Sequence, residues 1–281
     1  MKKHEFSIAV MLPTRARTDA LSRSIFSLID HAAELDKIQF IIGIDDDDTV
    51  AYEHFVNVIQ PNLDRRNITY TAIEFERLGY EGLNKYYNTL ATHADADWLF
   101  VWCDDAIMET KDWDVRIAEC TGEFKLLKVH THNEHPYSIF PIAPAEWYEL
   151  TGYLSHHQLI DTELSQLAYL LDIMKIIEVD VTHDRVDLTG NNNDDTANKD
   201  KKIFEGNPSN PYDFHYTTFA IQRQQDVMKL AEYMQKQGLD TSWWTNVLAG
   251  KQDPWENMRK NDPNKQTSQF KIADNGHTIK I

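Results

Sequence analysis

The sequence is poor in cysteine and in positive charge. Only two cysteines occur, Cys103 and Cys120, which argues against a disulfide framework and indicates a reducing compartment. Lysine and arginine number 28 against 45 acidic residues, for a net charge of −17. Such a charge disfavours a partner that lies along a phosphate backbone, although a local basic patch is compatible with it. We therefore expect no stable nucleic-acid partner.

Long apolar segments are missing as well. No stretch reaches the length of a membrane span, and the N-terminus, Met-Lys-Lys-His-Glu-Phe, lacks the apolar stretch of a signal peptide. We expect a cytoplasmic protein without a membrane span. A hydrophobic share of 42% with 11% aromatic residues is enough to fill a core. The 281 residues fit one large domain, or one domain with an appendage.

A glycine-rich turn is absent where many α/β nucleotide-binding proteins hold phosphate. The segment after the first apolar run reads Leu12-Pro-Thr-Arg-Ala-Arg17 and contains no glycine. This excludes both the dinucleotide-binding fingerprint and the Walker loop. The charge of a phosphate-bearing ligand must then be met in another way, for which metal-bound carboxylates at a later strand end are the obvious candidate.

A pair of adjacent carboxylates follows an apolar run. Residues 98–103 are all apolar or aromatic and predict a buried strand, which leads into Asp104 and Asp105 before apolar residues resume at Ala106. Adjacent carboxylates repel each other unless a cation lies beside them. We infer a divalent metal and, with it, a phosphate-bearing ligand. Oxygen ligands suit Mg2+ or Mn2+, and a histidine ligand favours Mn2+.

The hydrophobic pattern of the first hundred residues alternates between strands and helices. Apolar runs predict strands at 6–12, 38–44, 68–73 and 98–103. Periodic apolar positions predict helices at 18–32, with Thr18 as N-cap, at 49–59 and at 83–91. This order gives a parallel sheet with helices on both faces, which binds ligands at the carboxyl ends of its strands. The polar segments that would meet there are Pro13-Thr-Arg15, Asp45–Asp48 and Asp104-Asp105.

The order of elements changes after Trp113. Strands are expected at 124–129, 137–142 and 176–181, with a helix that contains Leu164 to Leu171. We expect a catalytic domain of residues 1–188, with a nucleotide-sugar half at about 1–115 and an acceptor half at about 116–188. Residues 189–281 are expected to hold a mobile Asn/Asp-rich loop at 189–202, a helix at about 218–237, a Trp243-Trp244 segment and a loosely tethered end from 259.

Taken together, these segments resemble the GT-A glycosyltransferases, most closely the inverting family 2 type. The likeness covers about residues 6 to 185. It is carried by Pro13-Thr-Arg, the acid that ends the second strand, Gly82-Leu-Asn-Lys, the Asp-rich strand end with Asp112-Trp-Asp114, and Phe140-Pro-Ile-Ala-Pro with Trp147-Tyr and Thr151-Gly-Tyr. It implies a GT-A-like (Rossmann-like) α/β fold with a mostly parallel sheet and a helical C-terminal appendage. It also implies metal-dependent, inverting sugar transfer from a nucleotide-diphosphate donor, most often a UDP-sugar, to a hydroxyl acceptor.

The resemblance also implies roles for individual residues. Asp105 matches the last acid of the family's Asp-x-Asp motif and would bind Mn2+ or Mg2+, with His183 as a second ligand. Asp161 matches the general base. The donor would be bound by Pro13, Thr14, Arg15, Asp45, Asp46, Asn84, Asn88 and Asp104. The chain departs from the family at Cys103, where the motif has an acid, which puts two-carboxylate chelation in doubt.

Other interpretations remain open at this stage. A nucleotidyltransferase would share the sheet and the metal but usually has a glycine-rich basic loop after the first strand. A non-catalytic module that binds nucleotide or sugar is compatible with Cys103. The carboxylate of Asp161 is also placed to cap a helix. Glycan, lipid-linked sugar, protein and modified nucleobase are all compatible as acceptors.

Clustered histidines and tryptophans have alternatives of their own. His130, His132 and His135, with His156-His157 downstream, have spacings that suit zinc but also suit the lining of an acceptor site. The tryptophans of the C-terminal part either pack it onto the core or stack on a sugar; they are Trp243, Trp244 and Trp255.

Overall fold

The apolar runs of the N-terminal half form parallel strands that alternate with helices. The computed structural model describes residues 4–131, 135–184, 220–260, 270–272 and 278–280. Its first elements are β1 (Phe6–Thr14), α1 (Thr18–His31), η1 (Leu35–Lys37), β2 (Ile38–Asp45), α2 (Thr49–His54), η2 (Phe55–Ile59), α3 (Gln60–Arg65), β3 (Thr69–Phe75), η3 (Tyr80–Gly82), α4 (Leu83–Ala91) and β4 (Ala96–Val101). β1 pairs in parallel with β2 and with β4, and β2 pairs in parallel with β3.

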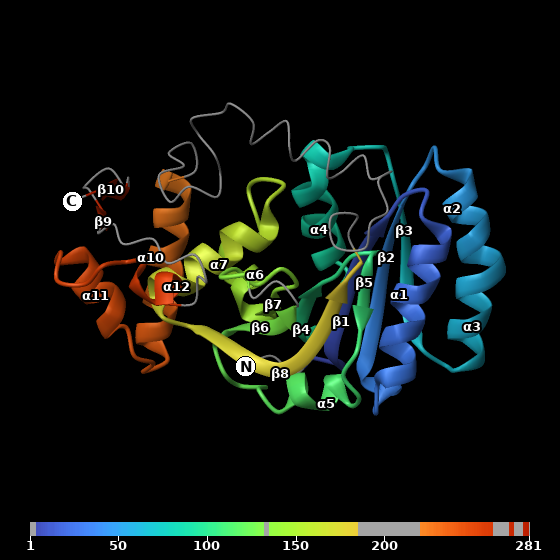
Figure 1. Cartoon of the computed structure of the whole chain (residues 1–281), viewed down its shortest axis with the longest axis horizontal. Helices are drawn as coiled ribbons and strands as arrows, with labels where there is room; N and C mark the ends of the chain where they lie inside the picture. The colour runs from blue at the N-terminus through green and yellow to red at the C-terminus, as the bar shows by residue number, and fades with distance from the viewer. Residues whose placement is uncertain (1–3, 132–134, 185–219, 261–269, 273–277, 281) are drawn as a thin grey trace.

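Shorter strands and packed helices follow. They are β5 (Ala106–Met108), α5 (Trp113–Ala118), β6 (Leu126–Thr131), β7 (Ile142–Pro144), α6 (Ala145–Thr151), α7 (Ile160–Leu171), β8 (Met174–His183), α10 (Ala220–Lys236), α11 (Ser242–Leu248), α12 (Glu256–Lys260), β9 (Phe270–Ile272) and β10 (Thr278–Lys280). One sheet has the strand order β3-β2-β1-β4-β7-β6-β8-β5, and β9 and β10 form a separate pair (Figure 1). β7 is antiparallel to both of its neighbours, and β5 is antiparallel to β8. The predicted α/β class with a mostly parallel sheet is confirmed.

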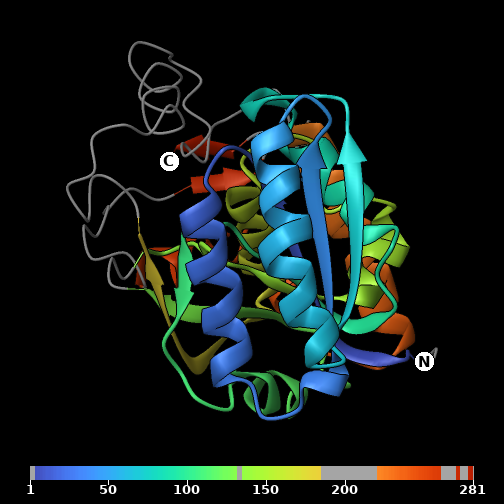
Figure 2. The ribbon, with the colours of Figure 1, turned by 90° about the vertical axis from the view of Figure 1, so that its right-hand side faces the viewer.

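Helices cover both faces of the sheet because its central strands are apolar on both sides. Successive side chains of a strand point to opposite faces. In β1, Ile8, Val10 and Leu12 pack in a cluster with α1 and the α2–α3 segment, whereas Ala9 and Met11 pack in a second cluster with α4. Figure 2 shows α1 and the α2–α3 segment side by side over the first of these faces. Since apolar side chains fill both faces of the sheet, polar residues can gather at the ends of its strands.

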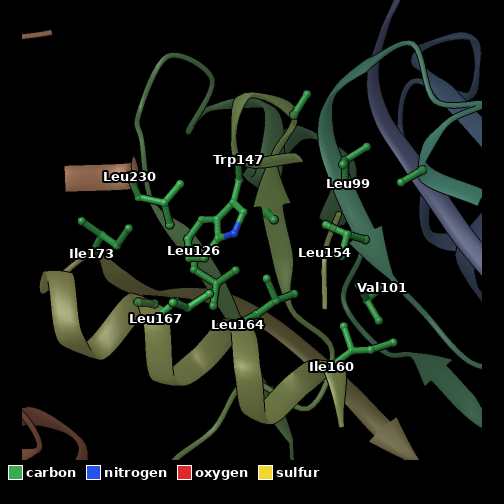
Figure 3. Packing of buried hydrophobic residues seen from close by; sticks show 14 of the residues in the cluster. Leu99, Val101, Leu126, Trp147, Leu154, Ile160, Leu164, Leu167, Ile173 and Leu230 are labelled. Atoms are coloured by element: carbon green, nitrogen blue, oxygen red, sulfur yellow. The ribbon is translucent and has the colours of Figure 1, made fainter. Parts of the chain in front are cut away.

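Helix α10, from the C-terminal part of the chain, packs into the same apolar core as α6 and α7. Every residue of α7 except Asp161 is buried. Leu164 and Leu167 of α7 pack with Trp147 of α6 and Leu230 of α10 in one apolar cluster (Figure 3). Trp244 and Trp255 are buried in the same cluster, which confirms packing rather than exposure for these two tryptophans.

Several predicted boundaries are wrong, three of them for a local reason that the structure shows. β4 runs from Ala96 to Val101, so the strand predicted at 98–103 begins and ends two residues too late, because Trp102 is buried by core packing after the regular strand has ended. Thr18 is the first residue of α1 and not its N-cap, since Arg17 holds that position without a capping side chain. The strand predicted at 137–142 begins only at Ile142, because the backbone N–H of Ser138 donates to Ser165 Oγ.

Some predictions fall on parts of the chain that the structure does not describe. The loop predicted at 189–202, His132 and most of the segment after residue 260 lie outside the described residues. The domain boundary predicted at residue 188 lies there too. Within the described residues, no helix is both long enough and apolar enough to span a bilayer.

Candidate functional site

Polar residues from distant parts of the chain meet at the carboxyl ends of β1, β2 and β4. Thr14 ends β1, Asp45 ends β2, and Asp104 and Asp105 follow β4. The antiparallel pairing of β5 with β8 sets Ala106 opposite His183, and the Asp184 N–H donates to the Asp105 carbonyl at 2.7 Å. The far end of β8 is thereby brought beside β5 (Figure 1). The convergence expected from the strand order is present.

Asp104 is buried and held by the turn after β1. One of its oxygens accepts from Thr14 Oγ1 at 2.8 Å and the other from the Arg17 guanidinium at 3.2 Å. Burial raises the pKa of Asp104 to about 7, the positive charge of Arg17 acts against that shift, and the charge of Asp105 adds to it. Asp104 is thus a desolvated acid that Thr14 and Arg17 orient. Arg17 was not among the predicted site residues.

Asp105 carries different contacts on its two oxygens. Its Oδ2 accepts from Arg17 at 3.1 Å. Its Oδ1 accepts from Cys103 Sγ at 2.7 Å and lies 3.4 Å from His183 Nε2. Burial alone would raise the pKa of Asp105, but the hydrogen bond and charge of His183, the Cys103 hydrogen bond and Arg17 outweigh burial and hold it well below its usual range.

Three possible metal-ligating atoms lie within 4.8 Å of one another, one each from Cys103, Asp105 and His183. We call these three residues the edge cluster. A carboxylate oxygen, an imidazole nitrogen and a thiol sulfur at this separation are a donor set that fits a divalent metal. Of the two ligands predicted from the sequence, Asp105 and His183 are both part of this cluster.

The segment between β4 and β5 is fixed by helices on both sides of the sheet. From α1, Ser24 Oγ donates to the Cys103 carbonyl at 2.9 Å and accepts from Trp102 Nε1 at 2.8 Å. From α4, the Tyr87 hydroxyl donates to the Trp102 carbonyl at 2.5 Å. Together with the bond of the Trp102 N–H to the Met11 carbonyl of β1 at 3.0 Å, these bonds hold the backbone that carries the edge cluster beyond the end of the regular strand.

Arg15 and the acids after β2 form a second polar group at the same edge. The Arg15 guanidinium donates to Asp45 at 2.8 Å and makes two hydrogen bonds to Asp47. Hydrogen bonding to Asp47 is the main cause of the raised pKa of Arg15. Asp48 accepts from the Ala16 N–H at 2.6 Å and caps α2 through Ala51. Asp45 and Arg15 are therefore adjacent, as a shared nucleotide site requires.

The remaining donor-site candidates have varied surroundings. Pro13 lies within β1 opposite Gly43, and Asp46 is exposed. The Asn88 amide donates to the Ser155 carbonyl at 2.9 Å and accepts from the Leu154 N–H at 2.7 Å, so it anchors the segment before α7. Asn84 makes a longer bond of 3.5 Å to the same Ser155 carbonyl.

Asp161 lies in the first turn of α7 and is half-buried. Its charge reaches Tyr87, a buried residue of α4. Burial is the main cause of the strongly raised pKa of the Tyr87 phenol, and the charges of Cys103, Asp104, Asp105 and Asp161 raise it further. Asp161 and the acids after β4 thus both raise the pKa of this buried phenol.

A second group of acids and histidines, which the sequence did not reveal, lies under α10. We call His156, Glu163 and Asp226 the α10 cluster; one donor atom of each lies within 4.8 Å of the others. Asp226 accepts from the Tyr153 hydroxyl at 2.5 Å, and its second oxygen lies 3.4 Å from His156 Nε2, both atoms being buried without a hydrogen bond. Glu163 accepts from Ser155 Oγ at 2.5 Å and from the His156 N–H at 2.9 Å.

Burial shifts the ionisation of the groups around the α10 cluster. It raises the pKa of Glu163 to about 7, against the hydrogen bonds from Ser155 and His156. It lowers the pKa of His157 to about 4, and the charges of Arg223 and His156 lower it further. Arg223 and Asp226 stand on the face of α10 that carries Val227 and Leu230. Charged residues on an apolar helix face were the signal that could have revealed this group.

The alternative zinc cluster has little support among the described residues. His130 Nε2 lies 4.0 Å from Glu178, whereas His156 and His157 face Asp226 and Glu163. Within the described part of the chain, the groups whose spacing suits a metal are the edge cluster and the α10 cluster. His132 lies outside the described residues.

Solved glycosyltransferase structures are similar to this chain over most of its length. Mannosyltransferase PcManGT from Pyrobaculum calidifontis, in complex with GDP-Man and Mn2+, matches with a TM-score of 0.53 at 12% identity, over 94% of this chain and 76% of that chain. S. aureus TarS 1–349 in complex with UDP-GlcNAc gives 0.51 at 14% identity, over 98% and 97%. GalNAc-T7 with UDP, GalNAc and Mn2+ gives 0.52 at 10% identity, over 85% and 56%.

These likenesses establish the fold. The chain has the GT-A fold of nucleotide-sugar glycosyltransferases, which confirms the prediction made from the order of its motifs. No protein-family model matches the chain, and no curated protein matches its sequence. Donor, acceptor and individual site residues must therefore be argued from the geometry.

Proposed function

We propose that this protein is a metal-dependent glycosyltransferase that moves a sugar from a nucleotide-diphosphate donor to a hydroxyl acceptor with inversion. The observation that carries the proposal is the edge cluster. Asp105, His183 and Cys103 gather at the edge of the sheet where the parallel strands end, and the same edge carries Arg15 and Asp45. In open α/β sheets this edge is where ligands bind. The PcManGT structure of the same fold contains GDP-Man and Mn2+.

The chain's own residues would divide the donor between them. Asp45 and Arg15, joined at 2.8 Å, would border the nucleoside, with Pro13, Thr14, Asp46, Asn84 and Asn88 around it. Asp104, oriented by Thr14, would contact the ribose or the sugar. Arg17, which contacts both Asp104 and Asp105, would offer its positive charge to the diphosphate.

Asp105 and His183 would hold Mn2+ or Mg2+. When bound there, the cation would supply Lewis-acid stabilisation of the charge that develops on the leaving diphosphate. On the acceptor side, Asp161 would take the proton of the attacking hydroxyl, which is the role of a general base. The half-buried position of Asp161 at the start of α7 leaves it accessible to an acceptor.

A thermal-shift screen of nucleotide-diphosphate sugars, with and without Mn2+, tests the proposal. We expect one donor to raise the melting temperature only when metal is present, by an amount that corresponds to about 2.7 kcal/mol at a hundredfold excess over Kd. Asp105→Ala should abolish this shift. Asp36→Ala, at an exposed position in η1, is the matched control and should retain it.

Release of nucleoside diphosphate then separates an enzyme from a binding protein. A glycosyltransferase hydrolyses its donor slowly even when the acceptor is missing, so the released nucleotide should exceed that of a protein-free sample. A pure binding protein would give the thermal shift without nucleotide release. Stabilisation that does not need metal, or that survives Asp105→Ala, would rule out the proposed metal role.

A further inference from the structure

The thiol of Cys103 lies against the carboxylate of the proposed metal site. Cys103 is half-buried, and its Sγ lies 2.7 Å from Asp105 Oδ1. His183 Nε2 approaches the same oxygen at 3.4 Å. Arg17 contacts the other oxygen, Oδ2, at 3.1 Å. Sulfur, nitrogen and oxygen donors therefore converge around Oδ1, on the side of the carboxylate away from the Arg17 contact.

We propose that Cys103 is a third protein ligand of this metal, so that the ion is held by thiolate, carboxylate and imidazole. The inference rests on the proposed function for the role of the site. Soft thiolate and imidazole ligands favour Zn2+ and Co2+, whereas Mg2+ prefers oxygen alone. The site should accordingly bind Zn2+ and Co2+ more tightly than Mg2+, with Mn2+ between them.

The distances suit such a site after one small change. With Zn–S at about 2.3 Å and Zn–N or Zn–O at about 2.0–2.2 Å, two donors at a tetrahedral angle lie about 3.3–3.6 Å apart. The Asp105–His183 separation of 3.4 Å is already of this size. The Cys103–Asp105 separation of 2.7 Å is shorter, because the thiol donates its proton directly to the carboxylate with no ion between them. Metal binding releases that proton to solvent, and the two atoms then separate by under about 1 Å.

The backbone around Cys103 keeps the thiol in place. Ser24 Oγ donates to the Cys103 carbonyl, and Tyr87 donates to the preceding carbonyl, that of Trp102. Three protein ligands leave a fourth position for an oxygen of the substrate, which is the pattern of a catalytic and not of a structural site. The second cysteine, Cys120, lies two residues after α5, and its Sγ contacts the Arg116 carbonyl at 3.7 Å. It provides a matched control.

Cobalt absorption spectroscopy tests the thiolate ligand directly. The reduced full-length protein is titrated with Co2+, and the near-ultraviolet sulfur-to-cobalt charge-transfer band is recorded. We expect the band in the wild type and in Cys120→Ser, and its complete loss in Cys103→Ser. His183→Ala should weaken cobalt binding while some charge-transfer absorption remains at saturating Co2+.

Calorimetric titration with Zn2+, Mn2+ and Mg2+ tests the metal preference. Cys103→Asp replaces the soft donor by a hard one at the same position. This variant should bind Zn2+ at least about tenfold more weakly than the wild type and should gain relative affinity for Mn2+ and Mg2+. Cys120→Ser should bind the three metals with the same order of affinity as the wild type. Circular dichroism of each variant shows whether its fold is intact.

The outcomes separate this inference from the proposed function. A charge-transfer band that persists in Cys103→Ser, or that is absent from a wild-type protein with bound Co2+, overturns the thiolate ligand. If that wild type still hydrolyses its donor with Mn2+, the proposed function stands. If the band depends on Cys103 but the protein turns over no donor, Cys103 is still a metal ligand, and the proposed function is overturned. Failure to bind any of these metals overturns both.

Discussion

The edge cluster and the α10 cluster combine similar residues in different surroundings. In the edge cluster, the side chains of Asp105 and His183 are 14% and 16% exposed. In the α10 cluster, the two acids are buried, Asp226 fully and Glu163 with 3% exposed, whereas the His156 side chain is 22% exposed. Solvent therefore reaches the carboxylate of the edge cluster, whereas the carboxylates of the α10 cluster are covered. Similar side chains therefore support binding at one place and packing at the other.

The balance of charge around the two clusters supports the same distinction. At the edge, the acids Asp104 and Asp105 share the guanidinium of Arg17. Under α10, the buried Arg223 acts electrostatically on Glu163, and Lys229 lies 3.6 Å from Asp226. The two acids of the α10 cluster thus have two cations of the protein beside them. At the edge, the guanidinium of Arg17 faces two adjacent acids, and a divalent cation would neutralise the remaining negative charge.

The N-terminus of α7 connects the two regions. Asp161 and Glu163 are two positions apart in the helix, and such residues do not face each other. Asp161 acts on Tyr87, next to the acids after β4, whereas Glu163 belongs to the α10 cluster. Substitutions at these two positions should therefore separate chemistry from stability.

The largest expected effect is on the chemistry and concerns Asp161. Asp161→Asn should lower the rate of donor hydrolysis by about 10²–10⁴-fold, because the amide cannot accept the proton of the attacking hydroxyl or water. The free energy of unfolding should change by less than about 1 kcal/mol, since the site is half-buried and not part of the core. Initial rates at saturating donor and Mn2+ measure the first effect, and urea unfolding measures the second. A rate within threefold of wild type, roughly 0.7 kcal/mol, would place the base elsewhere.

The next largest effect is on stability and contrasts Asp226 with Asp105. Asp226→Ala should lower the free energy of unfolding by about 3–5 kcal/mol, because Tyr153 and His156 lose the buried carboxylate that faces them. Asp105→Ala should lower it by less than Asp226→Ala does, since Arg17 keeps Asp104 and the repulsion between the two acids disappears, although the contacts of Asp105 with Cys103 and His183 are lost.

Urea unfolding and the metal-dependent thermal shift together measure this contrast. Asp226→Ala should keep the donor-induced shift at temperatures where it is folded, and Asp105→Ala should lose it. Similar losses of unfolding free energy in the two variants would contradict the distinction between a ligand site and a packing site.

The N-terminal half of the fold could be predicted because its strands are buried on both faces. Such strands form continuous apolar runs, as in Ile8 to Leu12, whose residues are all 0% exposed. The predicted end of β4 is wrong because a residue can be buried without being part of a strand. Trp102 continues the apolar run of β4, yet its carbonyl accepts from Tyr87 and not from a neighbouring strand. An apolar pattern in the sequence indicates which residues are buried, but not which groups form hydrogen bonds with their backbone.

The two clusters differ in how far the sequence could reveal them. Asp105 and His183 could be proposed together because both follow strand ends and because of the family resemblance. The contact of Cys103 with Asp105 needed coordinates, since β4 ends at Val101 and strand periodicity does not fix the side-chain directions of the irregular segment that follows. The α10 cluster joins α10 to the segment before α7, as does the Tyr153–Asp226 bond between residues 73 positions apart, and no local pattern encodes such a contact.

A smaller effect should appear in the pH dependence of stability. The pKa of Glu163 is raised to about 7 in the folded protein, so its contribution is fully present below about pH 4.5 and is lost as the pH rises to about 7. The pKa of His157 is lowered to about 4, so its contribution is fully present above about pH 6.5 and is lost as the pH falls to about 4. Across the shared range the two contributions have opposite slopes.

Two variants should separate these slopes. Relative to wild type, Glu163→Gln should lose about 1–3 kcal/mol of unfolding free energy as the pH falls from about 7 to about 5. His157→Gln should gain unfolding free energy relative to wild type over the same range. Urea unfolding at several pH values measures both differences. Slopes of the same sign in the two variants would contradict the assignment of these buried groups.

The smallest effect is expected at Lys229, the solvent-facing cation beside the α10 cluster. Lys229→Met should lower the free energy of unfolding by less than about 1 kcal/mol, because its side chain is 49% exposed and lies 3.6 Å from Asp226. Urea unfolding at low and high salt measures this, and the small loss should vanish at high salt, where exposed charges are screened. A loss as large as that of Asp226→Ala would show that Asp226 depends on a surface ion pair. The α10 cluster would then resemble the edge cluster in needing a cation from the solvent side, and burial would no longer distinguish the two.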